Sequence, residues 1–207
     1  MELDAAVARL RGAGVVAFPT DTVTGLGCLA ASADGVRAVF ALKGRPGENP
    51  LTLFVDGIES AAAVTGPVDS RARAMLRLVW PGAVTAVLPL AGSWPEGVGR
   101  AGTVGVRVPA HPVPRALVRL AGGPLATTSA NASGEPPLAD AAEAAARWGD
   151  RVVAVPGAAG TAPPAACAIP STVVDLTAWP PRVLREGAVS AAAIAELARE
   201  CERASFL

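Results

Sequence analysis

The sequence predicts an α/β fold with a mixed sheet. Segments with helical periodicity alternate with short apolar runs along the whole chain, the pattern of interleaved helices and strands. Of the 207 residues, 51% are hydrophobic and 17% are charged, so the chain can bury a sizeable core. The chain shows neither an internal repeat nor a clear linker, and we expect a single domain over residues 1–207.

The first half of the chain contains three predicted helices and three predicted strands. Apolar residues at intervals of three and four predict helices over residues 3–11 and 32–42, and Asp69 is suited to cap a third that ends before Trp80. Short apolar runs predict buried strands over residues 15–18, 51–55 and 85–88.

The second half continues the same alternation. Strands are expected over residues 104–108, 125–127, 151–155, 172–176 and 182–184. Helices are expected over residues 114–120 and 139–148, followed by a final helix capped by Ser190. Residues 156–170 are rich in Gly, Pro and Ala and predict a mobile loop.

Composition excludes several classes of protein. The formal net charge is zero, so a general affinity for nucleic acid is not indicated. The three cysteines are far apart and odd in number, which argues against a disulfide framework. The sequence shows no signal region and no apolar run near 20 residues, and we expect a cytoplasmic protein without a membrane span.

Motifs for several familiar chemistries are missing. The only histidine, His111, lies between prolines and is interpreted as structural, and the cysteine spacing fits no zinc site. The sequence has no P-loop and no G-x-S-x-G elbow. Gly25-x-Gly27-x-x-Ala30 has the spacing of a dinucleotide fingerprint, but Pro19 ends the preceding strand too early, so close packing or a turn is the better interpretation.

Two segments carry unusual polar groups. Lys43 continues the apolar face of the helix over residues 32–42, and Arg45 and Asn49 follow in the turn after it. This segment is equally consistent with an anion site and with a solvated basic helix end. The stretch "TTSANASG" (127–134) presents hydroxyls and an amide after a strand, and Arg107, Ser171 and Arg185 mark other strand ends, where α/β folds build sites.

Seven segments in order resemble the YrdC/Sua5 family of threonylcarbamoyl-AMP synthases. They are "FPTDTVTGLG", "KGRPGENPL", "WPGAVTAVL", "VGVRVPAHP", "TTSANASG", "STVVDL" and "LREGAVS". The resemblance runs from about Leu3 to Ser190, and the pairs Lys43/Arg45 and Ser129/Asn131 are typical of the catalytic branch. It implies a YrdC-like fold, a twisted, mostly antiparallel or mixed sheet with flanking helices around a concave, positively lined cavity.

The resemblance also implies an activity. The expected reaction joins L-threonine, bicarbonate and ATP into threonylcarbamoyl-AMP with release of pyrophosphate, for the t6A modification of adenosine 37 in tRNA. The expected cofactor is Mg²⁺, carried by ATP rather than by protein side chains, and the product would pass to the tRNA threonylcarbamoyl-transferase machinery. Two alternatives stay open: a module that binds tRNA or double-stranded RNA without catalysis, and a related enzyme that forms another carbamoyl-adenylate.

The family motifs assign roles to individual residues. Lys43 and Arg45 resemble the catalytic cations. The positions that resemble ATP contacts are Arg45, Asn49, Thr103, Ser129, Asn131, Pro137 and Arg185. The positions that resemble L-threonine contacts are Thr22, Phe54, Arg107, Thr127 and Ser171. Arg107 is expected to clamp the threonine carboxylate. Thr24 replaces an aromatic residue common in the family and is expected to leave a smaller side chain near the substrate.

Overall fold

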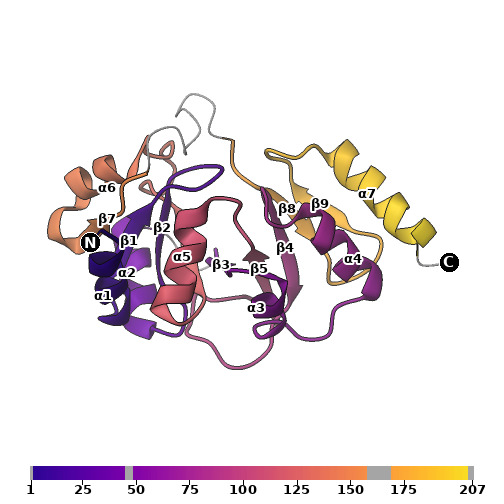
Figure 1. The fold of residues 1–207 in the computed structure, drawn as a ribbon, viewed down its shortest axis with the longest axis horizontal. Helices are drawn as coiled ribbons and strands as arrows, with labels where there is room; N and C mark the ends of the chain where they lie inside the picture. The colour runs from indigo at the N-terminus through magenta and orange to yellow at the C-terminus, as the bar shows by residue number, and fades with distance from the viewer. Residues whose placement is uncertain (1, 45–48, 158–168, 205–207) are drawn as a thin grey trace.

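A computed structural model describes residues 2–44, 49–157 and 169–204. Nine strands of the described chain form one sheet in the order β7-β1-β2-β6-β3-β5-β4-β8-β9, with helices packed against it (Figure 1). Parallel and antiparallel neighbours both occur: β1 pairs with β7 in parallel and with β2 in antiparallel. The predicted α/β fold with a mixed sheet is confirmed. Residues 158–168 of the predicted mobile loop lie outside the described residues.

The elements follow the predicted alternation closely. The helices are α1 (Glu2–Arg11), α2 (Ala33–Lys43), α3 (Ile58–Ala62), α4 (Ser70–Val79), α5 (Pro112–Ala121), α6 (Ala141–Trp148) and α7 (Ala191–Ala204). The strands are β1 (Val15–Phe18), β2 (Gly25–Leu29), β3 (Thr52–Phe54), β4 (Val84–Pro89), β5 (Thr103–Arg107), β6 (Leu125–Ser129), β7 (Val152–Ala154), β8 (Thr172–Asp175) and β9 (Arg182–Arg185).

Two of these elements were not predicted. The short helix α3 lacks a long apolar repeat, and β2 contains the glycine pair Gly25 and Gly27. In β2 the glycines make room for the ring of Phe18 on the neighbouring strand, since a Cβ on Gly25 would lie 2.6 Å from that ring. The prediction of close packing is confirmed, whereas a turn at these glycines was wrong.

Side chains and a glycine cap the helix ends, and the predicted cap at Asp69 is confirmed. Ser32 caps α2 by accepting a hydrogen bond from the N–H of Gly35, and Gly44 ends it in the left-handed conformation. Asp69 caps α4 by accepting from the N–H of Arg71. Cys201 of α7 is buried. In the described part of the chain, no helix is long and apolar enough to cross a membrane.

Alternation along the strands gives the sheet two chemically different faces. Val84, Ala86, Val104 and Val106 join a core to which α2, α4, α6 and α7 contribute buried residues. On the other face, α1 and α5 cover Phe18 and Phe54. The positions that share this second face on β4, β5 and β6 include Thr85, Arg107 and Thr127. The polar site therefore lies on the sheet face that α1 and α5 cover only in part.

Candidate active site

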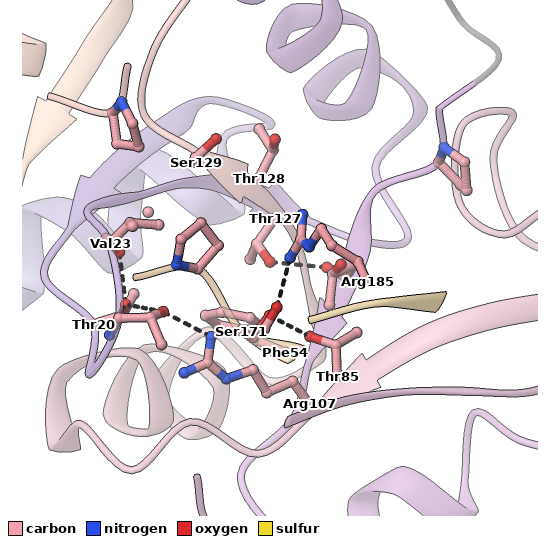
Figure 2. A pocket seen from close by; sticks show the side chains of 16 residues that line it. Thr20, Val23, Phe54, Thr85, Arg107, Thr127, Thr128, Ser129, Ser171 and Arg185 are labelled. Carbon is pink, nitrogen blue, oxygen red and sulfur yellow. Dashed lines mark hydrogen bonds between the residues drawn. The ribbon is translucent and has the colours of Figure 1, made fainter. Parts of the chain in front are cut away.

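A cavity opens on this second face, with its walls supplied by segments from both halves of the chain (Figure 2). Eight of the predicted site residues line it: Thr22, Phe54, Arg107, Thr127, Ser129, Pro137, Ser171 and Arg185. The five predicted threonine contacts are all in this set. The fold thus brings together side chains that are up to 163 positions apart in sequence, from Thr22 to Arg185.

The remaining predicted residues lie elsewhere. Lys43 and Asn131 are buried, and Lys43 Nζ donates a hydrogen bond to Asn131 Oδ1. Neither residue is among the described cavity lining. Thr103 donates its hydroxyl to the carbonyl of Arg100 at 2.9 Å, and Asn49 is exposed; neither is among the described lining residues. Arg45 falls in the segment 45–48, outside the described residues.

Arg107 is the buried cation of the cavity. It is 3% exposed, at the end of β5, with the ring of Phe54 5.5 Å below its guanidinium. Its Nε donates to the carbonyl of Gly82 at 2.8 Å, and its Nη1 donates to Thr22 Oγ1 at 2.9 Å. Side-on clamping of a carboxylate through Nε is therefore blocked, which leaves the Nη1/Nη2 end for a ligand.

Asp21 supplies the negative partner of Arg107. Its Oδ1 lies 2.8 Å from Arg107 Nη2, yet neither atom has a hydrogen bond in the described part of the chain. The contact is an ion pair in which the N–H groups of Nη2 are not directed along the short distance. The N–H groups of Nη2 could donate to a ligand oxygen, while Asp21 already compensates part of the Arg107 charge. Sequence reasoning missed Asp21, although it stands beside Thr22 in "TDT".

Burial lowers the pKa of Arg107, the nearby Asp21 opposes this shift, and the positive charge of Arg185 adds to it. Arg107 and Arg185 therefore both place positive charge at the cavity, and Asp21 offsets part of it. Arg185 ends the edge strand β9, and its Nη2 donates to the carbonyl of Ser171 at 2.7 Å. An anion bound between these guanidinium groups would relieve their repulsion, so the cavity is suited to anionic ligands.

The hydroxyls of the first loop form a directed chain (Figure 2). Thr20 donates its proton to the carbonyl of Val23 at 2.6 Å, so in its 3.1 Å contact with Thr22 Oγ1 it must accept. Thr22 therefore donates to Thr20 and accepts from Arg107 Nη1. One lone pair of Thr22 is left, and it can accept a hydrogen bond from an ammonium or hydroxyl of a ligand.

Several lining residues were not assigned to the site individually, although Thr20, Gly25 and Thr128 lie in segments that the sequence analysis singled out. Thr20, Thr52, Thr85 and Thr128 all contribute to the wall, as do the neighbouring positions Val23, Gly25, Pro50 and Pro170. Thr85 lies within an apolar strand and pairs with Ser171 at 2.9 Å between hydroxyl oxygens. The signal that could have identified Thr85 is a hydroxyl at a position that alternates with the core residues of its strand. Conversely, Thr24 donates to the carbonyl of Ala139 and is not among the described lining residues.

His111 is structural, as predicted. It is buried at the start of α5, where Nδ1 accepts from the N–H of Val113 at 3.2 Å and caps the helix. Burial lowers the pKa of His111 from 6.5, against a raising effect of the Asp21 charge. Protonation of this imidazole is thus harder in the folded than in the unfolded protein.

This difference predicts a pH dependence of stability. The contribution of neutral His111 is fully present above the unfolded pKa near 6.5, and it decreases as the pH falls, because the unfolded chain then binds the extra proton. The slope attributable to this group cannot exceed about 1.4 kcal/mol per pH unit. Urea unfolding between pH 5 and 7.5 should show this slope in the wild type and a smaller one in His111→Asn, which keeps a good capping residue. Equal slopes in both proteins would contradict the assignment.

Comparison with known proteins places this site in context. A model of the Sua5/YciO/YrdC family, described as "Telomere recombination", matches residues 8–187. The chain is 36% identical over 179 residues to the threonylcarbamoyl-AMP synthase of Pyrococcus abyssi, covering 86% of this chain and 52% of that protein. It is 36% identical over 187 residues to the synthase of Bacillus subtilis, covering 89% and 53%. The chain thus spans about half the length of these two relatives.

A shorter relative and a solved structure are also similar. The chain is 39% identical over 193 residues to a putative threonylcarbamoyl-AMP synthase of Mycobacterium tuberculosis H37Rv, covering 93% of this chain and 87% of that protein. The crystal structure of P. abyssi Sua5 complexed with L-threonine superimposes with a TM-score of 0.84 at 33% identity. That superposition covers 94% of this chain and 56% of the Sua5 chain.

Proposed function

The chain belongs to the Sua5/YciO/YrdC family, and from this premise we propose that it is an L-threonylcarbamoyladenylate synthase. The observation that carries the proposal is the cavity itself, which is lined by the cations Arg107 and Arg185 and by neutral hydroxyl groups. L-threonine, bicarbonate and ATP are the proposed substrates, and threonylcarbamoyl-AMP and pyrophosphate the products. The proposed setting is the cytoplasm, where the product would serve t6A modification of tRNA.

The threonine side of the cavity fits an amino acid with a free carboxylate. Arg107 Nη2, which has no hydrogen bond in the described part of the chain, would receive the carboxylate. Thr22 has one acceptor position left, which suits the amino group or the hydroxyl of threonine. Thr127 and Ser171 line the same region, and Phe54 forms its apolar floor beneath Arg107. P. abyssi Sua5, which is known in complex with L-threonine, supports this choice of amino acid.

The chemistry needs positioning and charge rather than a protein nucleophile. The amine of threonine would combine with bicarbonate to give a carbamate and water. A carbamate oxygen would then form a bond to the α-phosphorus of ATP, while the bond to pyrophosphate breaks. Two anions must approach in this step, and Arg185 with Arg45 would offset their repulsion. Lys43 would act on ATP binding indirectly, because its ammonium holds the 129–131 turn in place.

Mg²⁺ is proposed to enter with the nucleotide. Among the described residues no group of three or more His, Cys, Asp or Glu could hold a metal ion. The lining offers hydroxyls and guanidinium groups, which bind phosphate oxygens, and so fits a metal carried on the phosphates. When bound there, Mg²⁺ would supply charge neutralisation on the phosphates.

One assay tests the proposed function. The protein is incubated with ATP, Mg²⁺, bicarbonate and L-threonine, and pyrophosphate is measured. We expect release that requires both threonine and bicarbonate. Release without a need for threonine would instead favour a related carbamoyl-adenylate-forming enzyme. Salt-dependent binding of tRNA or double-stranded RNA without turnover would favour the RNA-binding alternative.

A further inference from the structure

Lys43 is the only lysine of the chain, which has 18 Lys and Arg residues together. It is 5% exposed at the end of α2, and three oxygens of the turn after β6 surround its Nζ. They are the carbonyl of Ser129 at 2.7 Å, the carbonyl of Asn131 at 2.9 Å and Asn131 Oδ1 at 2.6 Å. Three acceptors match the three N–H donors of an ammonium, whereas a planar guanidinium has a different donor geometry.

The backbone of Lys43 holds the same turn. Its carbonyl accepts from the N–H of Ser133 at 2.9 Å. The Nδ2 of Asn131 donates to the carbonyl of Glu135, and Asn131 is buried. The end of α2 is therefore fastened to residues 129–135 by both the side chain and the main chain of Lys43.

The ammonium also determines which atoms of the turn donate and which accept hydrogen bonds. Because an ammonium only donates, the Asn131 atom at 2.6 Å must be the amide oxygen and not the nitrogen. Ser129 Oγ lies 2.7 Å from the same oxygen, so the hydroxyl of Ser129 must direct its single proton there. Ser129 also lines the cavity. It can offer only lone pairs to a ligand while these bonds persist.

We propose that Lys43 is a positioning residue that commits the Ser129 hydroxyl to Asn131, so that Ser129 accepts a hydrogen bond from the nucleoside part of ATP. This inference rests on the proposed use of ATP. Phosphate oxygens at neutral pH are acceptors and cannot pair with a hydroxyl whose proton is already committed. The amino group of adenine and the hydroxyls of ribose are donors and can. Lys43 therefore acts on the nucleotide through Ser129 and not by contact with the phosphates.

The first arm of the test needs no nucleotide. Protein labelled with ¹³C and ¹⁵N only in lysine has one lysine spin system. We expect the ammonium protons of Lys43 to exchange slowly with water in the wild type, and to lose this protection in Asn131→Ala. An unprotected ammonium in the wild type would overturn the inference, whatever the protein does with ATP.

The second arm compares ATP with three analogues that each lack one donor: 2′-deoxy-ATP, 3′-deoxy-ATP and the triphosphate of purine riboside. Calorimetry should show that Ser129→Ala weakens ATP binding about five- to tenfold, the usual effect of one hydrogen bond. For one analogue, Ser129→Ala should have no effect, because its partner is already missing. Lys43→Met should remove the same discrimination. Equal weakening of ATP and all three analogues would overturn the inference.

Controls separate this result from failure of the proposed function. Ser133→Ala makes the same change in the same turn, but Ser133 is exposed and only its backbone N–H bonds to Lys43. It should bind all four nucleotides like the wild type. If wild-type protein binds no nucleotide, the proposed function fails, whereas the lysine exchange still decides whether Lys43 fixes the turn. A large shift of the lysine signal with tripolyphosphate alone would show direct phosphate contact and overturn the inference.

Discussion

Arg107→Met should lower kcat/KM for L-threonine by about two to three orders of magnitude, the usual cost of a preorganised charged donor in an enclosed site. Arg107 is the one cation buried among the predicted threonine contacts, and its Nη2 has no hydrogen bond in the described chain. Without it, a threonine carboxylate would enter a buried site beside Asp21 with no opposite charge. ATP binding should change less than threefold, because Arg185 and the 129–131 turn are unaltered.

The same substitution should also destabilise the fold, which must be separated from the effect on activity. Removing one partner of a fully buried ion pair costs about 3–5 kcal/mol, and the partial exposure of Asp21 should reduce this value. The double variant Arg107→Met/Asp21→Asn removes both charges. It should regain much of the free energy of unfolding without regaining the use of threonine.

Pyrophosphate release at varied threonine, together with urea unfolding, measures both quantities. Arg115→Met is the matched control: its Nε donates to the carbonyl of Asp56, and it lies outside the described cavity lining. If the double variant uses threonine as well as the wild type, Arg107 has no role in binding the carboxylate. If Arg107→Met alone keeps kcat/KM within threefold, the same conclusion holds.

The fold could be predicted wherever a strand or helix is determined by its own residues. Val15–Phe18 and Thr103–Arg107 are short β-branched or apolar runs, and the structure contains both as strands. Strand β2 could not be predicted, because Gly25 and Gly27 have little preference for a strand. Its formation depends on Phe18, which fills the space above the glycines, and that contact exists only after β1 and β2 pair.

The site could be predicted in outline for a similar reason. Polar residues at strand ends, such as Arg107 and Ser171, are visible in the sequence and meet in the cavity. The face of Thr85 follows from its alternation with Val84 and Ala86, but the pairing of β4 with β8 that brings it to Ser171 is visible only in the fold. Thr24 illustrates the opposite case: it neighbours two lining residues, Val23 and Gly25, yet its hydroxyl bonds to Ala139. Its size therefore should not set the selectivity for threonine.

For Lys43, helical periodicity predicts burial but not the hydrogen-bond partners. Its place on the apolar face of α2 correctly predicts burial. The acceptors, however, come from a turn 86 and 88 positions away, which no local pattern reveals. The sequence therefore identified a cation that needs compensating partners, but the orientation of those partners required the fold.

Arg185→Ala should lower kcat/KM for ATP by about 100-fold, corresponding to roughly 3 kcal/mol of transition-state stabilisation. Arg185 lies at the rim of the cavity on the edge strand β9, and its charge already affects Arg107 across the site. In the proposed reaction it would stabilise the charge that develops on the leaving pyrophosphate. Because the Arg185 side chain is exposed and makes one hydrogen bond in the described chain, to the carbonyl of Ser171, its removal should change stability little.

Arg182→Ala is the matched control, since Arg182 begins the same strand, is exposed and pairs with Asp175 at 3.3 Å, outside the described cavity lining. The pyrophosphate assay at saturating threonine, with ATP varied, should show the loss only for Arg185→Ala. The KM for threonine should stay within about threefold, because Arg107 remains in place. Equal losses in the two variants would indicate a general effect of charge at the sheet edge, and the assignment of Arg185 to the phosphates would then be wrong.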